Sequence, residues 1–589
     1  MNDRPPPMSA PILDPRLGDF ESDHSAPKQR SLLAIAGSLL GEISLPKLAV
    51  IWTMQILAPA VLLGLAPLIL TASIGKASSR LAEATWIGAA ILVIAAAVAA
   101  FYGGRPLFRL LEQNFWSLNA LGVQPGYAFW REAIRHATER SLGGRTGPGL
   151  ARMRAASCAA AGVLLFVVAA FVATLAWPET QWIGSVADLT APQRLILPTV
   201  ANTIVVMSAY LAVAALIWGF SEALADQPLD LAPAPAPPAG ARVFRVAHLS
   251  DVHVIGERYG MRIESGRAGA RGNGRFERTL ARLSAIHAEN PLDLVLVTGD
   301  VTDAGTSAEW AEFLDILERF PELAALTLIA PGNHDVNIVD RANPARLDLP
   351  FSPIKVLRRM RTLSALAAVH GDRVRVSRDG ATVPLGEALG PWRADIETFA
   401  DRSGFALSRR LQRLWNETFP LILPPEGESG LGVAILDSNA DTHFSFTNAL
   451  GLIPVEQAKR LIAAFDAHPR AGWIVALHHH VTEYPRPVAA FSERIGTALI
   501  NGAWFLRELK PYADRIVVMH GHRHVDWVGA CGALTVVSAP SPVMAPDGRA
   551  THCYVHALTV GPGGRVSLLE PERVEIAAEP AVQPAPAVA

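Results

Sequence analysis

Residues 243–253 read VFRVAHLSDVH, a short apolar run that ends in an acidic and an imidazole side chain. The same arrangement returns in residues 292–303, LDLVLVTGDVTD, where an apolar run leads into Gly299 and Asp300. Short apolar runs rich in β-branched residues are typical of buried strands. Open α/β sheets bind their ligands at the strand ends, which is where these polar residues stand. The two stretches therefore predict an α/β domain with a functional site at its strand ends.

Further strands and helices are predicted downstream. Runs of strand length and composition occupy residues 326–330, 432–436, 473–477, 516–519 and 534–538. A last pair, 554–560 and 565–569, flanks Pro562-Gly563-Gly564 and predicts a hairpin. Helical patterns lie between several strands, at residues 276–288, 307–319 and 454–467. Strands that alternate with helices predict a layered α/β domain, which we place over residues 242–575.

Polar clusters stand where the predicted strands end. They are Asp251-Val252-His253, Gly299-Asp300, Gly332-Asn333-His334-Asp335, His478-His479-His480 and His520-Gly521-His522-Arg523-His524. Alternate residues of an extended segment face the same way, so Asp251 can converge with His253, and His522 with His524. Carboxylate, amide and imidazole groups without a thiolate favour Mn, Fe, Zn or Co over a structural zinc finger. The clusters therefore predict a transition-metal site.

The series DxH, GDxxD, GNHD, HH and GHxH, in this order over residues 251–524, resembles the calcineurin-like metallophosphoesterases. It is most similar to their cyclic-nucleotide and glycerophosphodiester phosphodiesterase branch, which residues 435–438 and 451–461 also match. The resemblance covers residues 243–560 and implies a four-layer sandwich, two β-sheets flanked by helices. It further implies a phosphohydrolase with two divalent metal ions, in which a metal-bridging hydroxide attacks phosphorus in line.

The resemblance also implies a role for each site residue. One metal would be held by Asp251, His253, Asp300 and His524. Asp300 would bridge to a second metal, which would be held by Asn333, His478 and His522. His334 would stabilise charge or protonate the leaving alkoxide, and Asp303 would orient it. Because residues 478–480 offer three imidazoles for one position, His479 stays an alternative to His478, which is favoured as the first residue beyond its strand.

Two departures from related branches bear on the substrate. Protein Ser/Thr phosphatases of the superfamily carry GDxVDRG and GNHE, whereas this chain has Ala304 at the phosphate-binding Arg position and Asp335 in place of the Glu. The lipid A pathway pyrophosphatases usually have Arg where His334 stands. A phosphodiester such as a cyclic nucleotide or glycerophosphodiester is therefore the leading substrate. A phospholipid headgroup or lipid-linked pyrophosphate is the alternative, and a non-catalytic membrane sensor with a metal-binding regulatory module is the third possibility.

Residues 337–431 form a stretch that is longer than compact members of the family need. It carries helical patterns at residues 352–370 and 392–415. We expect either a cap near the site that selects the substrate or a peripheral insertion with no catalytic role.

The first 220 residues predict an all-α membrane region. Of the chain's 589 residues, 50% are hydrophobic and only 18% are charged, and the mean hydropathy is +0.26. Four apolar stretches are long enough to span a bilayer, which needs about 20 residues. They are residues 48–72, 84–102, 155–177 and 195–220, within a transmembrane region of residues 31–221.

Basic residues predict the orientation of this region. Between the second and third stretches stand Arg105, Arg109, Arg131, Arg135, Arg140, Arg145, Arg152 and Arg154, whereas the loop between the third and fourth has only Arg194. Loops rich in Arg and Lys stay in the cytoplasm. We therefore expect a multi-pass protein of the inner membrane with both termini and the catalytic domain in the cytoplasm. Within the basic loop, residues 127–142 predict an amphipathic helix on the lipid headgroups or an ordinary solvated helix.

Composition marks the remaining segments and limits the partners. The Ala- and Pro-rich residues 222–241 predict a semi-rigid linker, and residues 1–30 and 576–589 are expected to be disordered. A net charge of −2 gives no support for a nucleic-acid partner, which leaves the bilayer and a phosphate ester. The three cysteines, Cys158, Cys531 and Cys553, have no CxxC spacing and argue against a disulfide framework.

Overall fold

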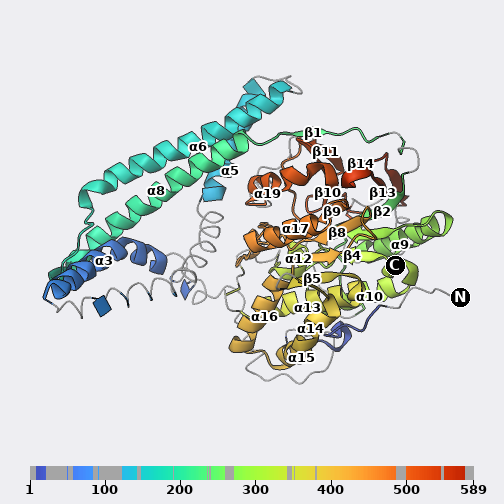
Figure 1. Cartoon of the computed structure of the whole chain (residues 1–589), viewed down its shortest axis with the longest axis horizontal. Helices are drawn as coiled ribbons and strands as arrows, with labels where there is room; N and C mark the ends of the chain where they lie inside the picture. The colour runs from blue at the N-terminus through green and yellow to red at the C-terminus, as the bar shows by residue number, and fades with distance from the viewer. Residues whose placement is uncertain are drawn as a thin grey trace, which may run out of the picture. The chain divides into compact units, whose positions relative to one another are not determined.

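The computed structural model describes most of the chain. The described residues are 8–20, 58–83, 124–141, 148–189, 191–234, 241–258, 271–340, 352–378, 381–485, 499–544 and 549–577, with isolated positions between them. The chain divides into two compact units (Figure 1). One is residues 45–225, and the other joins residues 226–589 with residues 1–44.

Two β-sheets build the larger unit. The first has nine strands in the order β1 (Pro228–Asp230), β11 (Trp527–Cys531), β12 (Leu534–Ser538), β10 (Ile516–His520), β9 (Gly472–Ala476), β8 (Leu431–Ile435), β7 (Leu421–Leu423), β5 (Arg375–Arg378) and β6 (Ala381–Pro384). The second has the order β14 (Val566–Leu568), β13 (Thr551–Val560), β2 (Val243–Leu249), β3 (Leu294–Val297) and β4 (Thr327–Ile329), with β15 (Glu572–Ile576) paired to β13. The predicted α/β domain with two sheets is confirmed.

The central strands of both sheets are parallel, and this brings their polar ends together. In one sheet β2, β3 and β4 run parallel, and in the other β8, β9, β10 and β12 do so. Strands buried on both faces need apolar side chains in both directions, which explains the continuous apolar runs in the sequence. Along β9, Ile474 packs in the core that includes β2 and β3, while Trp473 and Val475 pack in a second core beneath α17 (Val455–Ala467) and α19 (Gly502–Leu509).

The described part of residues 337–431 is packed into this domain and is not peripheral, while a role in substrate selection stays a prediction. Helix α13 (Pro353–His370) is buried along nearly its whole length and packs against β4 and the short helix α12 (Asn333–Val336). Strands β5, β6 and β7 extend the nine-stranded sheet. The helical pattern at 392–415 is two helices, α15 (Arg393–Arg402) and α16 (Phe405–Thr418), because Ser403 and Gly404 have positive φ. The segment therefore supports the end of β4 and the short helix α12 that follows it.

Two segments that were expected to be disordered or spacer-like pack on the larger unit. The described part of the N-terminal thirty residues, 8–20, lies against the domain, with Ser9 N donating to Ala368 O at 3.0 Å. In the linker, β1 pairs with β11 at the sheet edge, and Ala234 bridges Leu569. Both segments lack a helical or strand periodicity, so composition alone predicted no structure for them. The expected disordered tail, residues 576–589, lies almost entirely outside the described residues.

The smaller unit is helical. Its main helices are α3 (Ala58–Glu83), α5 (Gln124–Ser141), α6 (Pro148–Ala176) and α8 (Ile196–Ala223). Among the described residues three segments are long and apolar enough to cross a membrane, namely Val61–Ser78, Gly149–Glu179 and Gln193–Ala223. The second predicted stretch, residues 84–102, lies almost entirely outside the described residues.

Helix α5 packs on α6, and its Arg131 donates to Glu222 of α8 at 2.8 Å. Arg135 pairs with Glu132 at 2.9 Å, and both side chains are buried. The alternation of aromatic and basic residues did not predict these two buried ion pairs. Phe129 and Trp130 are exposed, so the choice between a headgroup-bound and a solvated helix stays a prediction.

Candidate metal centre

Each predicted metal ligand lies directly beyond a strand end. Asp251 and His253 follow β2, Asp300 follows β3, and Asn333 follows β4. From the other sheet His478 follows β9, while His522 and His524 follow β10. Most of these side chains are buried, which is unusual for ionisable groups unless they pair or bind an ion.

The backbone of the ligand loops is strained. Asp251, His253, Asp300, His522 and His524 have φ of 56°, 42°, 50°, 77° and 52°. They are five of the six non-glycine residues with positive φ in the described part of the chain. Such conformations cost about 1–3 kcal/mol each and persist at functional sites where the surrounding structure enforces them. The side chains of each pair therefore converge through tight turns, and the alternation expected of an extended strand is not what brings them together.

Two groups of ligand atoms result. In the first, His524 Nε2 lies 3.3 Å from Asp251 Oδ1, and His253 completes the group. In the second, His478 Nε2 lies 3.3 Å from Asp300 Oδ2 and 3.0 Å from His522 Nδ1. Asp300 also faces the first group, because the same Oδ2 atom lies 3.7 Å from His253 Nε2. This carboxylate therefore lies close to both groups of ligand atoms.

The hydrogen bonds of His478 test whether a cation fits the second group. Its Nδ1 lies 2.8 Å from the carbonyl oxygen of Thr298, so Nδ1 carries a proton and Nε2 is the nitrogen that faces the other ligand atoms. Nε2 lies 3.0 Å from Asn333 Oδ1, besides the carboxylate of Asp300, and although burial lowers the pKa of His478, this carboxylate raises it to about 9. The group thus attracts positive charge at Nε2, which a divalent ion would supply in place of the proton, and a carbonyl that fixes the tautomer is typical of metal-binding histidines. The residues therefore fit a divalent metal ion.

The electrostatics keep the carboxylates ionised. Burial raises the pKa of Asp300, but the imidazoles of His478 and His334 outweigh it and hold this pKa well below its usual range. Burial likewise opposes ionisation of Asp251, yet His524 lowers the pKa of that carboxyl to about 2. Both groups stay charged as the pH falls from neutrality until it approaches these low values, so they are available as anionic ligands at neutral pH.

The structure separates the two candidate histidines. His479 belongs to none of the groups of converging ligand atoms, although its ring lies 4.4 Å from that of His522, and its Nδ1 lies 2.9 Å from Ser438 Oγ. Its ring packs on Gly451, where a Cβ atom would lie 2.6 Å from the ring. His479 therefore fills the space behind the site, and we propose His478 as the ligand.

Replacement of His478 and His479 by Ala is expected to have different effects. His478→Ala removes a ligand atom and should weaken Mn²⁺ binding by at least about 100-fold. His479→Ala should leave binding within about tenfold and mainly lower the unfolding temperature, because it removes buried packing. Titration with Mn²⁺ and thermal unfolding of the two variants measure this difference. Equal loss of metal affinity in both would contradict the assignment.

His334 and Asp303 are arranged differently from the expectation. The ring of His334 is oriented by the backbone of Asp303, with Nδ1 2.6 Å from the carbonyl oxygen. The Asp303 carboxylate lies 4.0 Å from that nitrogen but 3.5 Å from His253 Nδ1. Asp303 is therefore better placed to orient His253 through its side chain. The sequence predicted that Asp303 orients His334, but it could not show that the backbone carbonyl oxygen makes the contact.

Asp335 is a site residue for which no role was predicted. Its carboxylate accepts hydrogen bonds from Thr302 N at 2.8 Å, Thr302 Oγ1 at 2.7 Å and Gly332 N at 2.8 Å. It therefore joins the loop after β3 to the loop after β4. Burial and the charge of Asp300 raise its pKa to about 7. Its place three residues after Gly332, where a capping carboxylate returns to the backbone, was the available signal.

Comparisons with known proteins find similar sequences and structures. Residues 244–526 match the family model of calcineurin-like phosphoesterases. A Coxiella burnetii protein named "Probable cyclic nucleotide phosphodiesterase" is 29% identical over 111 residues, which are 19% of this chain and 39% of the relative. A dimetal phosphatase from Danio rerio is 11% identical, with a TM-score of 0.32, over 57% of this chain and 99% of that one. A purple acid phosphatase from yellow lupin, Lupinus luteus, is 11% identical, with a TM-score of 0.28, over 58% and 55%.

Proposed function

We propose that the chain hydrolyses a phosphodiester with two divalent metal ions. The proposal starts from the match of residues 244–526 to the family model of calcineurin-like phosphoesterases. The observation that carries this proposal is the convergence of two groups of ligand atoms on either side of Asp300. The structure also brings His253, Asp303 and His334 within reach of one another next to them.

The proposed metal sites use the residues of the two groups. Asp251, His253 and His524 would hold one ion, Asn333, His478 and His522 the other, and Asp300 would contact both. Ions bound there would stabilise charge on the phosphate oxygens and lower the pKa of a bound water. Mn, Fe, Zn and Co all suit this set of oxygen and nitrogen ligands.

His334 is the group that we propose to handle the leaving-group proton. The hydrogen bond from Nδ1 to the Asp303 carbonyl fixes the ring, so Nε2 is the nitrogen that can hold a proton toward a substrate. This side chain is 14% exposed, more than the buried His478, so a substrate can reach it. The His334 backbone N also donates to Asp300 Oδ1 at 2.8 Å, and this ties the proposed acid to the proposed bridging ligand.

A phosphodiester substrate is supported by the matched relative and by the loop after β3. Ala304 is buried at the position where protein phosphatases of the superfamily carry an Arg. The chain therefore lacks a cation there for the extra negative charge of a phosphomonoester. The match covers only 39% of the relative's length, so the name of the relative does not establish the substrate of this chain.

A phospholipid headgroup or lipid-linked pyrophosphate is the second candidate. It is favoured by the three helices that are long and apolar enough to cross a membrane. We propose that these helices, together with the predicted stretch at residues 84–102, anchor the chain in the inner membrane with both termini in the cytoplasm, as the arginine distribution predicts. Extraction of the full-length chain from membranes by carbonate would contradict anchoring.

Metal removal and a substrate panel test the proposed function together. Full-length protein in detergent should hydrolyse bis-p-nitrophenyl phosphate, and a chelator should lower the rate at least about 100-fold, with recovery on addition of Mn²⁺. Parallel assays use 3′,5′-cyclic nucleotides, glycerophosphodiesters, p-nitrophenyl phosphate and phospholipid vesicles. Faster turnover of the diesters than of the monoester supports the first candidate, and phosphate-ester release from vesicles alone supports the second. Hydrolysis that is insensitive to the chelator would contradict both.

A further inference from the structure

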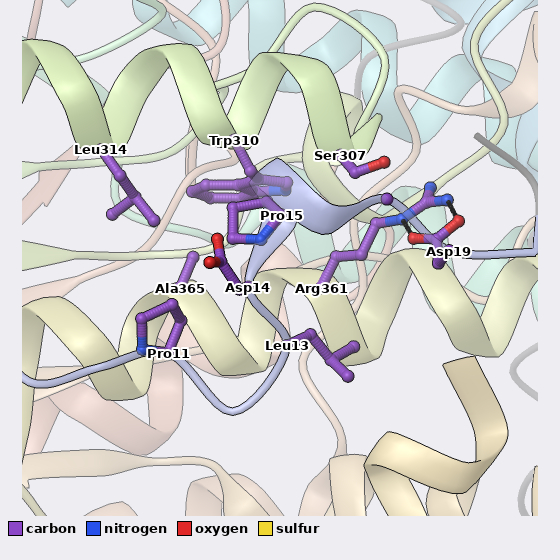
Figure 2. Close-up of a pocket in the computed structure, with 11 residues that line it drawn as sticks. Pro11, Leu13, Asp14, Pro15, Asp19, Ser307, Trp310, Leu314, Arg361 and Ala365 are labelled. Atoms are coloured by element: carbon purple, nitrogen blue, oxygen red, sulfur yellow. Dashed lines mark hydrogen bonds and ion pairs between the residues drawn. The ribbon is translucent and has the colours of Figure 1, made fainter. Parts of the chain in front are cut away.

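Residues 8–20 lie across two helices that support the site. The short helix η1 (Pro15–Leu17) packs on α10 (Ser307–Glu318), where Pro15 and the buried Trp310 line one small hollow (Figure 2). On α13, the Oγ atom of Ser364 accepts a hydrogen bond from Leu13 N at 2.7 Å. The segment is thus anchored to α10 and α13 at several points along its length.

The strongest anchor is an ion pair. Figure 2 shows the carboxylate of Asp19 facing the guanidinium of Arg361, which donates to both carboxylate oxygens. Asp19 is 5% exposed and Arg361 is 4% exposed, so both charges have left water. A buried charge that loses its partner is strongly unfavourable, because nothing replaces the lost hydration. Asp19 therefore fixes where the Arg361 side chain can lie.

Arg361 connects the segment to the candidate metal centre. Its Nη1 donates to the carbonyl oxygen of Gly305 at 3.1 Å, on the loop that begins with Asp300. Gly305 N in turn donates to Thr302 Oγ1 at 3.1 Å. The next residue of α13, Thr362, donates to the carbonyl oxygen of Asp335 at 3.0 Å. One turn of α13 therefore holds both the loop after β3 and the loop after β4.

We propose that residues 8–20 form a strap whose Asp19 is a positioning residue for the proposed reaction. Asp19 holds Arg361 against Gly305, and Gly305 in turn fixes the loop that carries Asp300 and Asp303. The strap is supplied by a part of the chain that precedes the apolar helices. This inference rests on the proposed phosphoesterase function for its catalytic consequence, but the hold on the loop is a property of the structure alone.

The substitution Asp19→Asn in the full-length protein tests the strap. It keeps the shape of the side chain and removes its charge. We expect kcat on bis-p-nitrophenyl phosphate to fall about tenfold with KM within about twofold, since small displacements of reacting groups cost one or two orders of magnitude in rate. Hydrogen exchange of the peptide covering residues 300–306 should become about tenfold faster. Hydrogen exchange can be measured without any activity. It therefore tests whether the strap holds residues 300–306 even if the wild type hydrolyses none of the phosphate esters.

Two further variants separate positioning from folding. The double variant Asp19→Asn/Arg361→Met leaves no unpaired charge, so it should fold while it loses the contact to Gly305 and shows the same fall in kcat and the same faster exchange. Arg16→Ala is the matched control, because Arg16 lies on the same strap but pairs with Asp315 and Glu318 near the surface. It should leave kcat and exchange within about twofold. Normal kcat together with normal exchange in a folded Asp19 variant would overturn the proposal.

Discussion

Replacement of Asp300 by Asn is expected to lower kcat/KM by at least about a thousandfold on every phosphoester that the chain hydrolyses. The substitution keeps the shape of the side chain but removes the charge that faces His478 at 3.3 Å and His253 at 3.7 Å. Stabilisation of transition-state charge by metal ions is worth several kcal/mol, and each ~1.4 kcal/mol is a factor of ten in rate. Because Asp300 lies close to both ligand groups, its replacement should lower kcat/KM more than the replacement of any other single ligand.

Steady-state kinetics with saturating Mn²⁺, together with the metal content of the purified protein, measure this effect. We expect the bound metal to fall from two ions per chain to one or fewer. Asp466→Asn is a suitable control, because Asp466 accepts a hydrogen bond from Tyr512 at the surface and lies at the end of α17, ahead of the start of β9 and outside the ligand loops. Wild-type activity and metal content in the Asp300→Asn variant would remove the basis of the proposed function.

Replacement of His334 by Ala is expected to have an effect that depends on the leaving group. General acid catalysis contributes about 10²–10⁴ to a rate, so esters with alkoxide leaving groups should lose that factor. Bis-p-nitrophenyl phosphate should lose much less, because nitrophenolate leaves without a proton. The physical reason is that Nδ1 of His334 is occupied by the Asp303 carbonyl at 2.6 Å, so Nε2 is the site from which a proton can be given.

The ratio of the two rates, compared between the wild type and the variant, measures this prediction. His287→Ala is the matched control, since His287 is a half-buried histidine near the end of α9 (Arg271–Glu289), ahead of β3, and its Nδ1 accepts a hydrogen bond from Leu292 N at 3.0 Å. It should leave both rates unchanged. An equal loss on both substrates in the His334 variant would show that His334 stabilises charge or structure and does not donate the proton.

Much of the catalytic domain could be predicted because its signals are local. The predicted strands at 243–249 and 534–538 coincide with β2 and β12. Apolar runs of strand length that end abruptly in Asp, Asn or His identify both the strand and its functional end. The arrangement of the ligands in two groups followed the family resemblance. It did not follow from the alternation along an extended chain, since Asp251 and His253 lie in turns of positive φ.

The parts that could not be predicted depend on contacts distant in sequence. The Asp19–Arg361 pair joins residues that are 342 positions apart, and neither residue stands in a motif. Residues 337–431 read as an insertion because they are longer than compact members of the family need, yet α13 is buried and packs against β4 and α12. The role of Asp303 shows a further limit, because a sequence names a residue but does not distinguish its carbonyl from its carboxylate.

The packing of residues 8–20 on the catalytic domain constrains the topology of the whole chain. Both partners of the Asp19–Arg361 pair must lie on the same side of any bilayer, and the apolar helices lie between them in sequence. A chain that leaves one side and returns to it crosses an even number of times. The three candidate segments of the described residues therefore cannot account for all crossings by themselves: either residues 84–102 supply a fourth, or one of the three does not cross. An odd number of crossings is incompatible with the strap.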